Sequence, residues 1–136
     1  MMRTAAALAL IFLISGVSGA SAHHSLSFYE TYYYIRAEGI VSSFTWKNPH
    51  TDLVLTVTEP SGETDDIYFE GGSTARLNRG GFSADTLSAG DAITVFYNPK
   101  KNGMEGGFFL GIEKADGTLY ALPRFHQLEE RPSGAE

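Results

Sequence analysis

Hydrophobic and polar residues alternate along several short stretches of the chain, a pattern typical of β-strands with one buried face. Within residues 51–58, Leu53, Leu55 and Val57 share one parity, while polar residues and Val54 take most of the other. We therefore predict strands over residues 34–46, 51–58, 66–70, 92–97, 107–114 and 118–122. The residues expected to face a common interior are Leu53, Leu55, Val57, Ile67, Phe69, Ile93 and Val95.

Residues that favour turns separate these stretches. Asn48-Pro49 ends the first strand, because proline cannot donate to a strand ladder and disfavours helix at the residue before it. Gly39, in the middle of the first strand, indicates a bulge or a sharp bend. Ser73 is a residue type that caps helices, and two glycines follow residue 79, so a short helix is predicted over residues 73–79.

Three strands, a short helix and two or three further strands follow one another in the order of an OB-type barrel. We predict an all-β fold with one short helix, a small OB-like β-barrel that is closed or partly open. A β-sandwich is the alternative, because one sequence does not reveal strand order. The barrel is expected over residues 34–122, an N-terminal arm over 23–33 and a flexible C-terminal tail over 123–136. In such barrels the loops that correspond to residues 47–50 and 98–106 flank the usual ligand face.

The first 22 residues have the pattern of an export signal. Arg3 supplies a positive charge, an apolar run extends from Ala5 to Ile14, and Ala20-Ser21-Ala22 has the small residues of a cleavage site. We predict cleavage near Ala22 and a mature protein that is periplasmic or secreted. No second apolar stretch follows, so no stable membrane insertion is expected after cleavage.

The net charge and the absence of cysteine limit the partners and metal sites that the chain can have. The chain has a formal net charge of −6 at pH 7, and cleavage would remove one of its ten basic residues. An acidic protein does not neutralise phosphates, so no nucleic-acid partner is expected. The chain has no cysteine, which excludes disulfides and thiolate metal sites.

Several short motifs together resemble a family of small exported bacterial proteins of unknown function. They are His23-His24-Ser25, Gly39-Ile40-Val41, Trp46-x-Asn48-Pro49-His50, Arg79-Gly80, Leu87-x-x-Gly90-Asp91 and Ala115-Asp116-Gly117. The resemblance covers nearly all of residues 23–136, and the His-His-Ser start with the Asn-Pro-His turn is its most specific part. This chain departs from the family in Tyr32-Tyr33-Tyr34 and in Phe82, where the family more often has tryptophan. The resemblance implies export and a shared fold, and it implies no activity.

The histidines predict a copper-type metal site. Cleavage after Ala22 would give His23 a free α-amine beside its own imidazole, and these two nitrogens can chelate one ion. A further imidazole completes three nitrogen donors in a T, an arrangement called a histidine brace, which Cu(II) favours. His50, on the Asn-Pro-His turn, is the candidate for the third donor, with His24 as the alternative or as a partner of the ligands. His126 is expected to be solvated.

Two other interpretations remain open. A cut after Ala20 would expose Ser21-Ala22-His23, which also chelates Cu(II) through backbone nitrogens and does not need His50. Alternatively, the histidines are incidental and the chain is an interaction module for a protein or a glycan, with an unknown partner. No nucleophile–base set or phosphate-binding glycine loop is present in the sequence, so binding is favoured over catalysis, and a copper-dependent oxidase is the third hypothesis.

Overall fold

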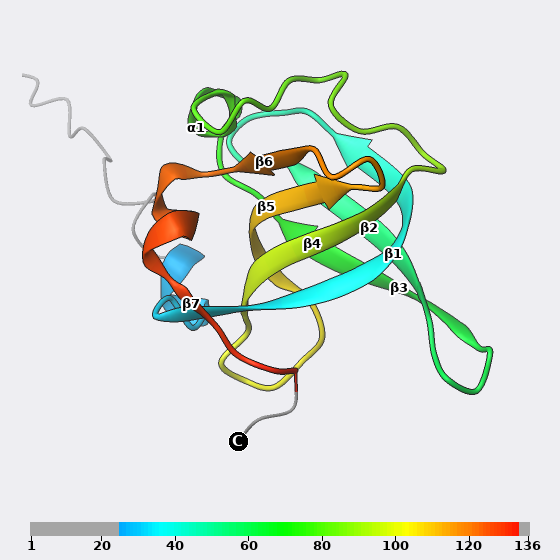
Figure 1. The fold of residues 1–136 in the computed structure, drawn as a ribbon. Helices are drawn as coiled ribbons and strands as arrows, with labels where there is room; N and C mark the ends of the chain where they lie inside the picture. Colours follow the sequence, from blue (N-terminus) through cyan, green and yellow to red (C-terminus); the bar gives the residue numbers. More distant parts are fainter. Residues whose placement is uncertain (1–24, 134–136) are drawn as a thin grey trace, which may run out of the picture.

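Five strands pair edge to edge into a ring in the computed structural model, which describes residues 25–133 (Figure 1). These strands are β1 (Tyr33–Thr45), β2 (Asp52–Thr58), β3 (Thr64–Glu70), β4 (Ala92–Pro99) and β5 (Gly107–Lys114). β1 pairs with β2 and β4, β3 pairs with β2 and β5, and β4 pairs with β5. The predicted all-β fold with one short helix is confirmed, and helix α1 (Thr74–Asn78) lies between β3 and β4 as expected. The strands form one sheet and not the two sheets of a sandwich.

The first strand bends as it passes from one neighbour to the other. Its first half pairs with β4 and its second half with β2, and both pairings include Ile40. At Gly39 a Cβ atom would lie 2.4 Å from the carbonyl oxygen of Thr56, so only glycine permits this approach of the two backbones. The register shifts between Val41 and Ser43, which places the bulge a few residues after the glycine that predicted it.

The predicted inward-facing residues form the core. Leu53, Leu55, Phe69 and Val95 have no exposed surface, and Ile93 is buried as well. Val57 and Ile67, the remaining two, are partly buried and pack against this cluster. The alternating pattern therefore identified the inner face of the ring, and burial of these apolar side chains is its main stabilising contribution.

Strand β5 is buried on both of its faces. Residues 107–112 are all buried, and neighbouring aromatic residues of this stretch contact different partners. The Phe108 ring lies 5.8 Å from the ring of Tyr29, whereas Phe109 lies 6.0 Å from Phe82. Strand β6 (Leu119–Ala121) pairs with β5 and adds to its burial.

The segment expected to be a flexible tail folds back onto the ring over most of its length. Pro123–Gln127 forms the 3₁₀-helix η2, and β7 (Glu129–Glu130) pairs in parallel with Tyr33 and Tyr34. The reason is aromatic packing, because the ring of Phe125 lies 4.8 Å from Tyr34 and 5.0 Å from Phe96. The last three residues of the sequence lie outside the described range.

The N-terminal arm is attached to the loop between β4 and β5. It begins with the 3₁₀-helix η1 (Ser25–Phe28), and Tyr29 then forms a β-bridge with Lys100. Glu30 N–H donates to the carbonyl of Pro99 at 2.8 Å. Within residues 25–133, no helix is long and apolar enough to cross a membrane.

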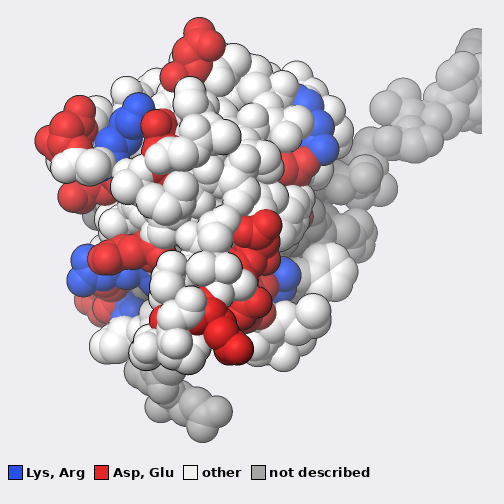
Figure 2. Space-filling view, turned by 90° about the vertical axis from the view of Figure 1, so that its right-hand side faces the viewer, with Lys and Arg blue, Asp and Glu red and all other residues white. Residues whose placement is uncertain are grey.

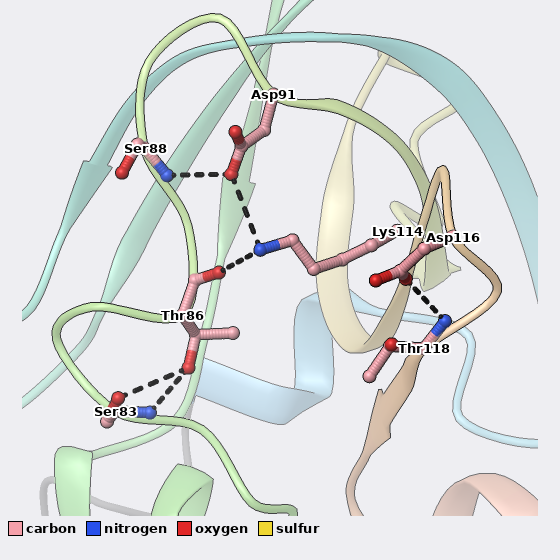
Figure 3. Close-up of polar contacts among 7 residues, drawn as sticks. All are labelled: Ser83, Thr86, Ser88, Asp91, Lys114, Asp116 and Thr118. Carbon is pink, nitrogen blue, oxygen red and sulfur yellow. Dashed lines mark hydrogen bonds and ion pairs between the residues drawn. The ribbon is translucent and has the colours of Figure 1, made fainter.

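Polar contacts hold the long connection between α1 and β4 (Figure 3). The Lys114 ammonium of β5 donates to the carbonyl of Thr86 at 3.0 Å and lies 3.7 Å from the Asp91 carboxylate. That carboxylate accepts from Ser88 N–H at 3.0 Å, and the Thr86 hydroxyl accepts from Ser83 N–H at 2.7 Å. These polar residues therefore have a structural role in fixing the connection against the ring.

Candidate functional site

The turn that carries His50 is fixed to the start of α1. The peptide bond Asn48–Pro49 is cis, and the Asn48 side-chain oxygen accepts from the backbone N–H and the hydroxyl of Thr74, at 3.0 and 3.1 Å. Thr51 exchanges backbone hydrogen bonds with the two glycines that follow β3, at 2.7 and 3.1 Å. His50 lies between these two attachments, so its backbone is held in place from both sides.

The His50 ring turns one nitrogen toward the protein. Nδ1 lies 2.9 Å from Oε1 of Glu70 and 3.3 Å from the carbonyl oxygen of Gly71. The carbonyl meets the geometry of a hydrogen bond and the carboxylate does not, so Glu70 is in contact with the ring without a hydrogen bond to it. A proton on Nδ1 leaves Nε2 with a free lone pair. The side chain is 40% exposed, and no group among the described residues bonds Nε2.

The Glu70 carboxylate connects His50 to the N-terminal arm. Its second oxygen, Oε2, accepts from the Tyr29 hydroxyl at 2.8 Å. Burial, and then the hydrogen bond to Glu70, raise the pKa of Tyr29 well above its usual value, so Tyr29 stays protonated and remains a donor. The arm is therefore attached directly to the residue that contacts His50.

Buried oxygens without hydrogen bonds gather beside His50. In the part of the chain that the structure describes, two side-chain oxygens are buried and lack a hydrogen bond, Oγ1 of Thr51 and Oε1 of Glu70. Burying a polar atom without a partner is unfavourable, and such atoms in a native fold ask for an explanation. Both belong to residues next to or in contact with His50, which marks this turn as a candidate site.

Asp52 adds a second carboxylate near the ring. It accepts from the Tyr68 hydroxyl at 2.5 Å and forms an ion pair with Lys47. Burial alone would raise the pKa of Asp52, but the hydrogen bonds from Lys47 and Tyr68 and the charges of Lys47 and His50 outweigh it and lower the pKa. Asp52 is thus an anion at neutral pH that already has two partners.

One known protein family matches most of the chain. The sequence model of a family of unknown function, DUF6152, matches residues 9–109. The chain belongs to the DUF6152 family. Neither a characterised protein nor a solved structure matches it. The matched range extends from the expected signal segment to the start of β5, so the DUF6152 domain includes His23, His24, Tyr29, His50 and Glu70.

The structure of this DUF6152 chain places one of the three predicted metal ligands. His50 lies on the turn as described, whereas His23 and His24 lie outside the described residues. Within residues 25–133, no group of three or more His, Cys, Asp or Glu side chains could hold a metal ion. His126 is exposed in η2 against the Phe125 ring, away from this turn in the sequence. A metal site at His50 would therefore need donors from residues outside the described range.

Two residues of the candidate site were not predicted from the sequence. Glu70 is placed by the pairing of β2 with β3, which sets it opposite Asp52, and Tyr29 is 41 residues away from it in the chain. The loop over residues 98–106 borders the same strand end, because Phe108 pairs with Glu70 and a Cβ on Gly106 would touch the Tyr68 carbonyl. No local sequence pattern signals either residue.

Proposed function

We propose that this DUF6152 chain is an exported protein, periplasmic or secreted, that binds Cu(II). The ligands are the α-amine and imidazole of His23, made available by cleavage after Ala22, and Nε2 of His50. His24 is either the alternative donor or a residue that contacts the ligands without binding the metal itself. The observation that carries this proposal is the His50 ring, whose Nδ1 contacts Glu70 and Gly71 while Nε2 has no partner among residues 25–133.

The environment of His50 resembles that of metal-bound histidines in general. Such a histidine almost always directs its second ring nitrogen to a carboxylate or a backbone carbonyl, which sets the tautomer and the ring orientation and makes the ligand more basic. His50 has both kinds of neighbour, at 2.9 and 3.3 Å. A cation bound at Nε2 would also give the buried Glu70 oxygen a favourable charge nearby.

The attachment of the arm supports a contribution from the N-terminus. Tyr29 bonds to the carboxylate that touches His50, and His23 is six residues before Tyr29. Six extended residues span at most about 20 Å, and the turn of η1 shortens this span. A mature N-terminus at residue 23 would therefore begin within about 20 Å of Tyr29, whose hydroxyl bonds to the carboxylate beside His50.

The chemistry of the donors suits Cu(II). An α-amine and an imidazole have pKa values of about 7.7–8.0 and 6.5, so both release protons at little cost near neutral pH. Cu(II) binds most tightly among the common divalent ions of its series and accepts nitrogen donors in a square-planar arrangement. Acid should release the metal as these nitrogens take up protons.

Competitive Cu(II) titration of four proteins tests the proposal. The first begins at His23, the second carries one additional residue before His23, and the other two begin at His23 and carry His50→Ala or His126→Ala. The extra residue converts the amine to an amide, and the His50 change removes one nitrogen, so both should weaken binding sharply. His126→Ala is the matched control and should leave affinity unchanged. Equal affinities for all four proteins would refute the proposed site.

A second candidate function is an interaction module for a protein or a glycan. Its support is the exposed apolar surface of the arm and the adjacent loop, where Phe28 is 68%, Tyr32 82% and Met104 64% exposed. Phe28 and Met104 border a hollow of about 480 Å³ that also includes Lys101. If the histidine variants do not change Cu(II) affinity, the interaction module replaces Cu(II) binding as the proposed function.

A further inference from the structure

Three arginines surround one hollow between helix α1 and the start of η2. The hollow has a volume of about 520 Å³ and is lined by Ser73, Ala75, Arg76, Arg79, Leu122, Pro123 and Arg124. This volume is within the range of ligand pockets in general. The two walls are brought together at Gly80, where a Cβ atom would lie 2.7 Å from the carbonyl oxygen of Ala121, so the end of α1 packs directly on the backbone before η2.

These three guanidinium groups have no acidic partner in the part of the chain that the structure describes. Among residues 25–133, the ion pairs involve Arg36, Lys47, His50 and Lys114, and none involves Arg76, Arg79 or Arg124. Burial, and then the positive charges of Arg124 and Arg79, lower the pKa of Arg76, so each of these two charges lies close enough to Arg76 to repel it. By contrast, the basic side chains visible on the face in Figure 2 lie next to acidic ones. Lys100, Lys101 and Arg131 have no ion pair among residues 25–133 either, so the distinguishing feature of the three arginines is that they line one hollow.

Contacts with the rest of the fold orient two of the arginines. The Arg76 guanidinium lies over the Phe108 ring, 5.4 Å from its centroid, in a cation–π contact. Arg124 donates from Nη2 to the carbonyl of Thr31 at 2.7 Å. Each contact uses only part of a guanidinium, which has five N–H donors. These contacts leave donors of both guanidinium groups unused, and both residues line the hollow.

We propose that this hollow binds the phosphate group of a small organic molecule. A dianion would offset two of the three positive charges and reduce their mutual repulsion. A tetrahedral phosphate presents oxygens in several directions, as needed to meet guanidinium groups from two separate segments, whereas a carboxylate presents two oxygens in one plane. Ala75, Leu122 and Pro123 supply an apolar wall for the organic part. This site is separate from the proposed copper ligands and does not depend on them.

The test is binding of inorganic phosphate and glycerol 3-phosphate to the purified protein, measured by calorimetry and by the rise in thermal midpoint at constant ionic strength. Both should bind saturably, and acetate should not. Arg79→Gln removes one donor and should weaken phosphate binding roughly tenfold or more, because hydrogen bonds to charged groups are among the stronger ones. Lys101→Gln removes the same charge from another surface and should have no effect.

Stability without ligand separates a binding role from a structural one. Removing one of three repelling charges should leave the thermal midpoint of Arg79→Gln unchanged or raise it in phosphate-free buffer. A lowered midpoint would show that Arg79 supports the fold, and it would overturn the proposal. Equal phosphate affinity in the wild type, Arg79→Gln and Lys101→Gln would overturn it as well.

A lipid phosphate is the other source of the same chemistry. Vesicles of phosphatidylcholine with and without phosphatidic acid distinguish the two sources. The proposal predicts that the soluble phosphates bind and that neither vesicle sediments the protein. Sedimentation with phosphatidic acid vesicles that Arg79→Gln abolishes, without binding of the soluble phosphates, would refute the small-molecule ligand.

Discussion

The hydrogen bond between Tyr29 and Glu70 should be a main attachment of the N-terminal arm to the ring of strands. Tyr29→Phe removes only the hydroxyl that donates to Oε2 of Glu70 at 2.8 Å. The ring keeps its place against Phe108, 5.8 Å away, so the change tests the hydrogen bond and not the aromatic packing.

The magnitude follows from the surroundings of the carboxylate. Hydrogen bonds to charged groups contribute about 1.5–3 kcal/mol. The Glu70 side chain is only 19% exposed, and its other oxygen has no hydrogen bond, so water replaces the lost donor poorly. We expect Tyr29→Phe to lower the free energy of unfolding by about 2 kcal/mol. For a domain of this size, each kcal/mol lowers the thermal midpoint by about 4 °C.

Urea unfolding followed by the fluorescence of the single tryptophan, Trp46, measures this difference. Tyr32→Phe is the matched control, because Tyr32 is 82% exposed and its hydroxyl has no hydrogen bond in the described part of the chain. It makes the same chemical change a few residues away and should lie within about 0.5 kcal/mol of the wild type. Equal free energies of unfolding for the two variants would refute the role given to the Tyr29–Glu70 bond.

Three further perturbations have defined outcomes. Leu55→Ala, at a position with no exposed surface, should lower the free energy of unfolding by about 2–5 kcal/mol in the same urea assay. Alkaline pH should destabilise the fold, because burial and the neighbouring carboxylates raise the pKa of Tyr29 and Tyr68. Above about pH 10 the unfolded chain releases these protons while the folded chain retains them, so the thermal midpoint should fall as pH rises, and less so in Tyr29→Phe. Asn48→Ala removes the acceptor for Thr74 and should lower the free energy of unfolding by about 1 kcal/mol. The same change should weaken Cu(II) binding, which titration would measure.

The strands could be predicted because side chains alternate between the two faces of a sheet. This rule placed Leu53, Leu55 and Phe69 inside, and all three have no exposed surface. The helix was predicted from its cap, since the Ser73 hydroxyl accepts from the N–H of Arg76 as an N-cap does. These features depend on residues close together in the sequence, which is why the sequence alone suffices.

Features that depend on long-range packing could not be predicted. Residues 123–130 have no strong periodicity, and their place on the ring of strands follows from contacts of Phe125 with aromatic side chains that lie far away in the chain. The same holds for the site. The Asn-Pro-His turn drew attention to His50, but Glu70 reaches it only through the register of β2 and β3. The path of the arm that brings Tyr29 to Glu70 leaves no mark in the local sequence.

Electron paramagnetic resonance of the Cu(II)-loaded protein that begins at His23 tests the copper site most directly. We predict one spectrum with three coordinated nitrogens. His50→Ala should change it to a spectrum with one nitrogen fewer, and His126→Ala should leave it as it is. Spectra that are the same for the wild type and for His50→Ala would contradict this prediction, because His50 would then not be a ligand.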